Sequence, residues 1–159
     1  EGGIAAALSL AEFFADNDKI AVVLGDNIIE RNIRHAVEAF RKQPEGARIL
    51  LKEVSDPQRF GVPVFEGDRI VRVEEKPANP QSNFAVIGIY MYDQRVFEFI
   101  RSLKPSQRGE LEITDVNNFY IREGKMKWDV LDGWWTDAGT FDSLQYAGNM
   151  VAKTGANRI

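Results

Sequence analysis

Hydrophobic positions along the chain alternate between helical and strand-like spacing. Apolar residues in 4–14 recur at helical spacing, and the polar residues 16–18 then supply a stop. Residues 19–24, KIAVVL, form a continuous apolar and β-branched run, which is typical of a strand buried on both faces of a parallel sheet. This alternation of helix and strand predicts an α/β fold.

The rest of the chain continues the same pattern. A hairpin is expected from 61–65 and 69–75, because Gly67 lies in the turn between them. Residues 83–92, NFAVIGIYMY, predict a long strand, in which Gly88 indicates a bulge or a close approach of backbone to a ligand. The other expected elements are helices at 32–41, 95–103, 112–123 and about 140–152, and strands at 47–54 and 125–131. We expect one domain over residues 1–159.

Composition narrows the classes of function. The net charge is −4 and the sequence pI is about 5.1, which disfavours nucleic acid as a partner because phosphate backbones require clustered Lys and Arg. The absence of cysteine excludes disulfides, thiolate nucleophiles and Cys-ligated zinc. No apolar run approaches the roughly 20 residues of a membrane span, so we expect no membrane partner and a cytoplasmic location. The single histidine, His35, is expected on a helix surface.

Two aspartates follow predicted strands, where ligands bind in open α/β sheets. Asp26 follows the KIAVVL strand, and Asp137 lies between a predicted strand and the last helix. Carboxylates suit Mg²⁺, which prefers hard oxygen ligands. Alternatively, Asp26 or Asn27 caps a helix, and so does Asp137 or Thr140. The presence of two such aspartates favours a shared metal site.

Three further features have both a structural and a functional interpretation. Glu75 and Lys76 end a predicted strand, either at a solvated hairpin tip or where they bind sugar hydroxyls and a phosphate. Arg108 is a candidate phosphate ligand, whereas the acids that follow it fit the first turn of a helix. Trp134 and Trp135 either belong to the core, or one of them stacks on a base or sugar.

Seven segments taken together resemble the sugar nucleotidyltransferases, and most closely the short-form glucose-1-phosphate thymidylyltransferases. They occur in the order of that family and cover nearly the whole chain up to about Leu144. Any one segment is a weak match, but seven in order are specific. The segments are GGIAAAL (2–8), VVLGDNI (22–28), DPQRFGV (56–62), VEEKP (73–77), SNFAVIGIYMYD (82–93), RGELEITDVNN (108–118) and GWWTDAGTFDSL (133–144).

The resemblance implies a three-layer αβα nucleotide-diphosphosugar transferase fold, Rossmann-like, with a mostly parallel mixed sheet. It implies a Mg²⁺-dependent single displacement in which glucose 1-phosphate attacks the α-phosphorus of dTTP, giving dTDP-glucose and pyrophosphate. Catalysis would rest on positioning and charge neutralisation. The family also implies a homotetramer that supplies deoxysugars such as rhamnose for polysaccharides.

The resemblance transfers roles to individual residues. Asp26 and Asp137 match the two metal-binding aspartates, and together with Lys76 they are the implied catalytic residues. The implied substrate contacts are the backbone of Gly3 near the base or sugar, the backbone of Gly61 on the sugar, Glu75 on the sugar hydroxyls, Lys76 and Arg108 on the sugar phosphate, Val86 in the sugar pocket, and Trp135 beside the metal site.

The chain departs from the family pattern at several places. Ala138 stands where the family has threonine, and Ala6 where thymidylyltransferases have glutamine. The G-x-G-T-R-L loop and lysine that open the family, and cradle the triphosphate, are not among these residues. We therefore expect the N-terminal βαβ portion to be absent and this chain alone to be inactive.

Two alternatives remain open. One is a related transferase that uses UTP, ATP or GTP with glucose or mannose 1-phosphate. The other is a non-catalytic, sugar-phosphate-binding regulatory homologue. The second is disfavoured because both aspartates of the metal pair are present. A redox Rossmann protein is more distant, because no dinucleotide fingerprint occurs in the sequence.

Overall fold

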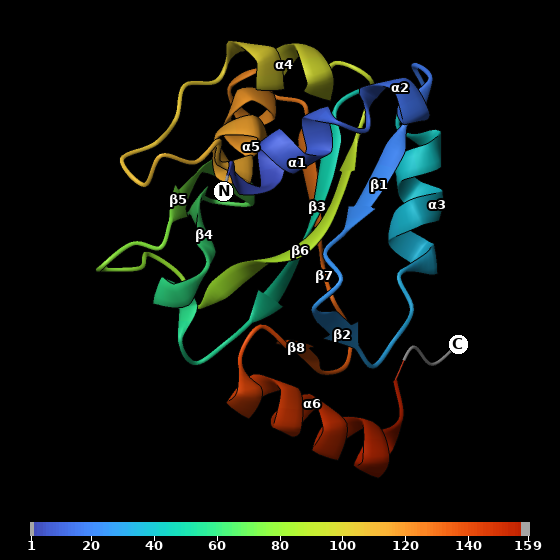
Figure 1. The fold of residues 1–159 in the computed structure, drawn as a ribbon, viewed down its shortest axis with the longest axis vertical. Helices are drawn as coiled ribbons and strands as arrows, with labels where there is room; N and C mark the ends of the chain where they lie inside the picture. Colours follow the sequence, from blue (N-terminus) through green and yellow to red (C-terminus); the bar gives the residue numbers. More distant parts are fainter. Residues whose placement is uncertain (1, 157–159) are drawn as a thin grey trace.

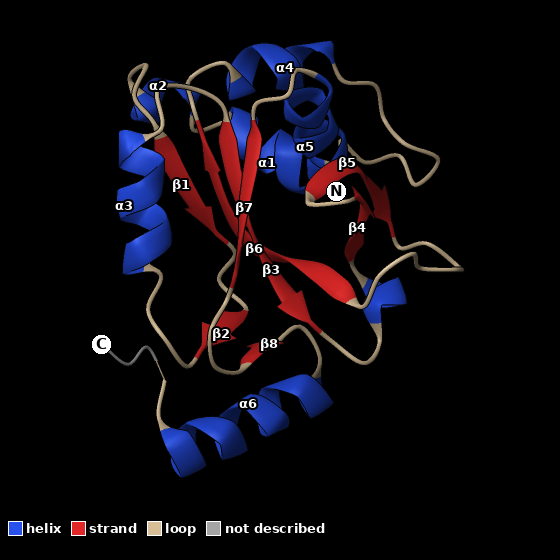
Figure 2. Ribbon diagram, turned by 180° about the vertical axis from the view of Figure 1, so that it is seen from behind, coloured by secondary structure: helices blue, strands red, loops and turns tan. Residues whose placement is uncertain are grey.

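The structure is a computed structural model that describes residues 2–156. Figure 1 shows the order of its elements and Figure 2 the opposite side. The elements are α1 (Gly3–Ser9), α2 (Glu12–Ala15), β1 (Ile20–Val23), β2 (Asn27–Ile29), α3 (Arg34–Lys42), β3 (Ala47–Glu53), the 3₁₀ helix η1 (Pro57–Arg59), β4 (Gly61–Glu66), β5 (Arg69–Glu75), β6 (Phe84–Tyr92), α4 (Val96–Ser102), α5 (Ile113–Arg122), β7 (Met126–Val130), β8 (Trp135–Asp137) and α6 (Phe141–Thr154).

A six-stranded mixed sheet forms the centre of the fold. Its strand order is β5-β4-β6-β3-β7, and β1 also pairs with β6. Strand β6 is antiparallel to β1, β3 and β4, and β4 is antiparallel to β5. Among the described strands, only β3 and β7 form a parallel pair. The expectation of a mostly parallel sheet is therefore wrong.

The reversed direction of β6 explains this difference. Strands β1, β3 and β7 run in one direction, as helical connections between strands favour. Strand β6 lies between β1 and β3 and runs the other way, so both of its long ladders are antiparallel. A buried apolar run predicts a central strand, but it carries no information on strand direction.

Helices cover both faces of the sheet, which confirms the three-layer prediction. Tyr90 and Tyr92 of β6 belong to the larger core, against α1, α4 and α5. Ile89 and Met91 belong to the second core, together with Phe40 of α3. Successive strand residues point to opposite faces. Because both faces are buried, β6 is apolar throughout rather than alternating.

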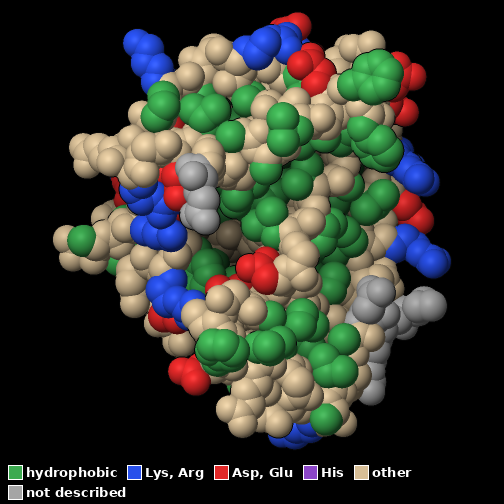
Figure 3. Space-filling model, in the orientation of Figure 1, with side chains coloured by type: hydrophobic (Ala, Val, Ile, Leu, Met, Phe, Trp, Pro, Cys, Tyr) green, Lys and Arg blue, Asp and Glu red, His purple; other side chains and the backbone are tan. Residues whose placement is uncertain are grey.

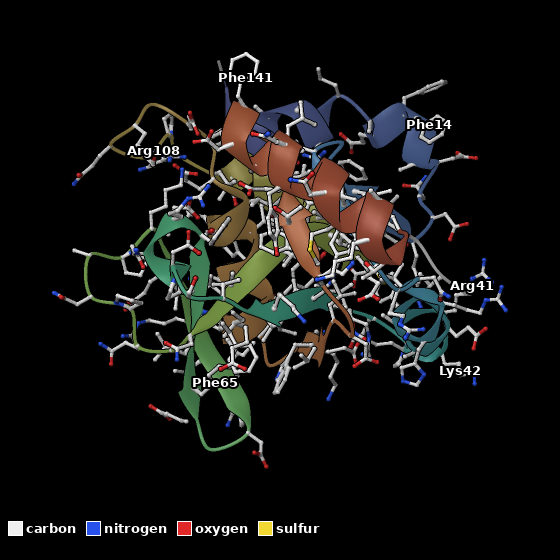
Figure 4. All side chains as sticks on the ribbon, turned by 90° about the horizontal axis from the view of Figure 1, so that it is seen from below. Phe14, Arg41, Lys42, Phe65, Arg108 and Phe141 are labelled. Atoms are coloured by element: carbon white, nitrogen blue, oxygen red, sulfur yellow. The ribbon has the colours of Figure 1, made fainter. Side chains whose placement is uncertain are left out.

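The N-terminal helix is shorter than its apolar spacing predicts. The expected helix over 4–14 is divided into α1 and α2. Phe13 and Phe14 are 97% and 90% exposed, so this apolar stretch does not pack as one continuous face. Figure 4 shows Phe14 projecting away from the ribbon. The predicted stop is confirmed, because Asp16 and Asn17 have positive φ angles of 47° and 61°.

A second sheet of two short strands, β2 and β8, was not expected from the sequence. It pairs Asn27 with Asp137, Ile28 with Thr136 and Ile29 with Trp135. Figure 1 shows this sheet between the large sheet and α6. Helix α6 begins with a capping box, in which Thr140 and Ser143 exchange hydrogen bonds. None of the helices in residues 2–156 is long and apolar enough to traverse a membrane.

Candidate active site

A cavity of about 730 Å³ opens between β6, α5, the hairpin β4–β5 and the small sheet β2–β8. Its size is within the range of small-molecule sites. Figure 3 shows a hollow on this face, with basic side chains on one side of it and acidic side chains beside it. All of the residues to which the sequence assigned a site role, with the exception of Gly3, line the cavity: Asp26, Gly61, Glu75, Lys76, Val86, Arg108, Trp135 and Asp137.

The small sheet brings Asp26 and Asp137 together. Asn27 pairs with Asp137, and the amide of Ala138 donates to the carbonyl of Asp26 at 2.7 Å. Neither aspartate caps a helix, because β2 follows Asp26 and Thr140 caps α6. The two carboxylates therefore line one cavity although 111 positions separate them in the chain.

Asn27 joins three parts of this region. Its Nδ2 donates to Asp26 Oδ1 at 2.8 Å. Its Oδ1 accepts from the Gly88 amide at 2.9 Å and from Trp135 Nε1 at 2.7 Å. A Cβ on Gly88 would lie 2.5 Å from Asn27 Nδ2. Glycine at position 88 therefore permits the contact between β6 and β2, and Asn27 orients the carboxylate of Asp26.

A third carboxylate, that of Glu75, lines the cavity from the end of β5. Glu75 Oε2 accepts a hydrogen bond of 2.5 Å from the hydroxyl of Thr114 in α5. Gly61 pairs with Glu75 on one side and with Val86 on the other. A Cβ on Gly61 would lie 3.2 Å from Val73 and 3.4 Å from the Thr114 hydroxyl. Glu75 is therefore fixed by an adjacent strand and by α5, rather than lying at a solvated hairpin tip.

Three cationic side chains among the described residues line the cavity: Arg59, Lys76 and Arg108. Arg108 donates to Glu110 at 2.7 Å and to both oxygens of Glu112 at 3.1 Å. The hydrogen bond with Glu112 raises the pKa of Arg108 above its usual value, and the charge of Glu110 adds to the effect. The paired carboxylates hold the guanidinium beside the cavity and offset its charge.

Lys76 has an unusual backbone conformation for a lysine. Its φ of 45° is in the left-handed region, and its amide donates to the carbonyl of Phe60 at 3.0 Å. Non-glycine residues in this region are uncommon and cluster at functional sites. No ion pair links the Lys76 side chain to another residue of the described part, so its charge is free for a ligand.

Arg59 is a cavity residue that the sequence did not indicate. Its guanidinium pairs with Asp56 at 2.9 Å and with Asp137 at 3.5 Å. The hydrogen bond with Asp56 raises the pKa of Arg59, and the charge of Asp137 contributes as well. Its only signal in the sequence was membership of the matched segment DPQRFGV.

Gly3 is not among the residues that line the cavity, and its backbone contact with the base or sugar stays a prediction. A Cβ on Gly3 would lie 2.5 Å from the carbonyl of Leu111, and its φ is 83°. Glycine at position 3 therefore lets α1 pack against the segment before α5. Glu112 is more than an acid in a first helical turn, because it binds Arg108 and the hydroxyl of Ser106.

The paired tryptophans have separate roles. Trp135 lines the cavity and contacts the ring of Phe60 edge to face at 5.3 Å between centroids. The Nε1 of Trp134 donates to the hydroxyl of Thr154 at 2.6 Å, which fastens the end of α6. Thr114, Tyr90 and Asn117 also line the cavity, although no separate argument from the sequence selected them.

Comparisons with known proteins match this geometry. The sequence model of the family described as nucleotidyl transferase matches residues 1–154. A glucose-1-phosphate thymidylyltransferase of Neisseria meningitidis serogroup A is 42% identical over 153 residues, which cover 94% of this chain and 53% of that protein. This chain thus spans about half the length of the curated relatives it matches.

Solved structures show the same similarity. A Bacillus anthracis crystal structure, described as a glucose-1-phosphate thymidylyltransferase in complex with a sucrose, is 54% identical with a TM-score of 0.89. The match covers 94% of this chain and 61% of that one. A UDP-glucose pyrophosphorylase with UDP-glucose shares the fold at 24% identity, with a TM-score of 0.86 over 96% of this chain and 62% of that one. Because the family match extends over residues 1–154, the chain belongs to the nucleotidyl transferase family.

Proposed function

We propose that the protein transfers a thymidylyl group from dTTP to glucose 1-phosphate, giving dTDP-glucose and pyrophosphate. The observation that supports this most directly is the convergence of Asp26 and Asp137 in the cavity that also holds Glu75, Lys76 and Arg108. Carboxylates for a metal, an acceptor for sugar hydroxyls and cations for a phosphate are the groups that such a reaction needs.

The charge of the cavity supports a role for Mg²⁺. Against its three cations, the cavity has an excess of two negative charges among the described residues. The five acids that line it are Asp26, Glu75, Glu110, Glu112 and Asp137. Such a surface would repel phosphates unless a cation offset the excess. The described residues contain no cluster of three or more His, Cys, Asp or Glu suited to a metal. A pair of carboxylates still fits Mg²⁺, which commonly takes one or two from the protein and the rest from phosphates and water.

In the proposed reaction a phosphate oxygen of glucose 1-phosphate forms a bond to the α-phosphorus of dTTP. The bond from that phosphorus to the β-phosphate oxygen breaks, and pyrophosphate leaves with the electron pair. Glu75 accepts hydrogen bonds from the sugar, while Lys76 and Arg108 hold its phosphate. Asp26 and Asp137 would hold Mg²⁺, which supplies positive charge against the phosphate oxygens. The nucleophile is already anionic, so no side chain has to remove a proton.

Asp26→Asn and Asp137→Asn test this proposal. Each is expected to lower pyrophosphate release by roughly a hundredfold or more, because a neutral amide cannot replace a carboxylate in the metal site. Asp142→Asn is the matched control, because Asp142 is exposed in the first turn of α6. The chain spans about half the length of its relatives, so turnover is measured on the complete gene product. Unchanged turnover in either variant would refute the metal-pair assignment.

The choice of nucleotide is tested with the same assay. We expect dTTP to be preferred when dTTP, UTP, ATP and GTP are each offered with glucose 1-phosphate. Preference for another nucleotide would instead support a related transferase. Ligand binding without turnover by any of them would support a regulatory homologue. A homotetrameric assembly and supply of dTDP-glucose for rhamnose-type sugars stay predictions that rest on the family resemblance. A cytoplasmic location stays a prediction from the hydropathy of the sequence.

A further inference from the structure

One carboxylate of the proposed metal pair already has a cationic partner within the protein. Arg59 Nη2 lies 3.5 Å from Asp137 Oδ2. Asp26, the other member of the pair, forms no ion pair with a described residue, and its Oδ1 accepts a hydrogen bond from the neutral amide of Asn27 at 2.8 Å. A divalent cation therefore meets a competing positive charge at Asp137 and none at Asp26.

Arg59 is anchored by contacts that do not involve Asp137. Its Nη1 lies 2.9 Å from Asp56 Oδ2, three positions earlier in the chain, so this contact is shorter than the one with Asp137. Its guanidinium carbon lies 5.2 Å from the centroid of the Phe60 ring. Phe60 is itself fixed, because its carbonyl accepts from the Lys76 amide at 3.0 Å. The guanidinium can therefore leave Asp137 and stay attached to Asp56.

The surroundings of Arg59 provide space for this movement. The Arg59 side chain is 46% exposed, and it lines a second cavity of about 380 Å³ as well as the first. Glu53 and Asp56 line this second cavity but not the first. Carboxylates are thus available to the guanidinium at a position away from Asp137.

We propose that Arg59 is an internal counter-ion that competes with a divalent cation for Asp137 and moves toward Asp56 when that cation binds. This inference rests on the function proposed above, because it takes Asp26 and Asp137 as the metal pair. Two positive charges at one carboxylate repel each other, whereas the forked guanidinium can exchange one carboxylate for another. Arg59 therefore lowers the affinity of the pair for a divalent cation. It acts through Asp137 and is a positioning residue.

Arg59→Gln is the direct test, with Arg101→Gln as the matched control. Arg101 also pairs with a carboxylate, that of Glu12 at 2.6 Å, but lines neither cavity. Mn²⁺ is the probe, because the paramagnetic resonance signal of free Mn²⁺ reports how much is bound to the complete gene product. Arg59→Gln is expected to bind Mn²⁺ roughly tenfold more tightly than wild type, since a positive charge near the ion is removed. Arg101→Gln should keep the wild-type affinity.

Two further measurements distinguish the charge of Arg59 from a purely structural effect. The gain in Arg59→Gln should shrink as the salt concentration is raised, because salt screens interactions between exposed charges. Arg59→Lys keeps the positive charge while it loses the forked geometry, so it should bind Mn²⁺ within about twofold of wild type.

The outcomes separate this inference from the function on which it rests. If wild type binds Mn²⁺ and Arg59→Gln binds it equally well or more weakly, the counter-ion role is wrong and the proposed function stands. A gain that is the same at every salt concentration, or that Arg59→Lys shares in full, would also refute the role of the charge. If neither wild type nor Arg59→Gln binds Mn²⁺, the metal pair of the proposed function is refuted together with the counter-ion.

Discussion

Replacement of Gly88 by alanine tests whether close packing between β6 and β2 supports the site. A Cβ at position 88 would lie 2.5 Å from Asn27 Nδ2, 2.9 Å from Asn27 Cγ and 2.8 Å from a methyl of Leu24. Gly88 does not have a positive φ, so alanine can adopt its backbone conformation. The conflict is therefore with the neighbouring side chains, and the amide of Asn27 must move.

The magnitude follows from what Asn27 holds. Overpacking of this kind typically costs about 1–3 kcal/mol. Displacement of Asn27 also removes the acceptor of the Gly88 amide and of the Trp135 indole, at about 1 kcal/mol each because both are only partly buried. The lower chain entropy of alanine returns roughly 0.5–1 kcal/mol. We expect a net loss of about 3 kcal/mol in the free energy of unfolding.

Urea denaturation followed by circular dichroism measures this loss. With a typical slope of about 1–3 kcal/mol per M, the midpoint should fall by about 1–3 M. Gly148→Ala is the matched control, because it lies within α6 and a Cβ there would contact nothing within 4 Å. It should stabilise the protein by about 0.5–1 kcal/mol. If Gly88→Ala is as stable as this control, the close packing around Asn27 is not real.

Two further predictions concern single carboxylates. Glu75→Gln keeps an oxygen to accept from Thr114 but loses its charge, so glucose 1-phosphate should bind roughly tenfold more weakly by calorimetry. The control Glu74→Gln loses a surface pair with Arg72 and should not change the affinity. Equal affinities of wild type and Glu75→Gln would contradict the role of Glu75. Burial, with the charge of Glu112, raises the pKa of Asp115. The folded state then binds more protons than the unfolded state between the ordinary and the raised pKa, so stability falls as pH rises through this window. Asp115→Asn should therefore raise the urea midpoint at pH 7 and leave it unchanged below about pH 3. A gain of equal size at both pH values would show that the stabilisation does not come from removing the charge of Asp115.

The secondary structure of the large sheet could be read from the sequence because its signals are local. The run 83–92 predicts a buried strand, and β6 occupies Phe84–Tyr92. The glycine turn predicts the hairpin, and β4 and β5 form it. Such patterns reflect the period of side chains along one element. The direction of a strand and the identity of its neighbours depend on the whole chain. This is why the prediction of a mostly parallel sheet was wrong.

The chemical identity of the candidate site was contained in the sequence, since the motifs named Asp26, Glu75, Lys76, Arg108 and Asp137 together. That these side chains share one cavity was decided by tertiary structure alone. Strands β2 and β8 have three residues each, too few for a periodic pattern, and they become strands only by pairing with each other.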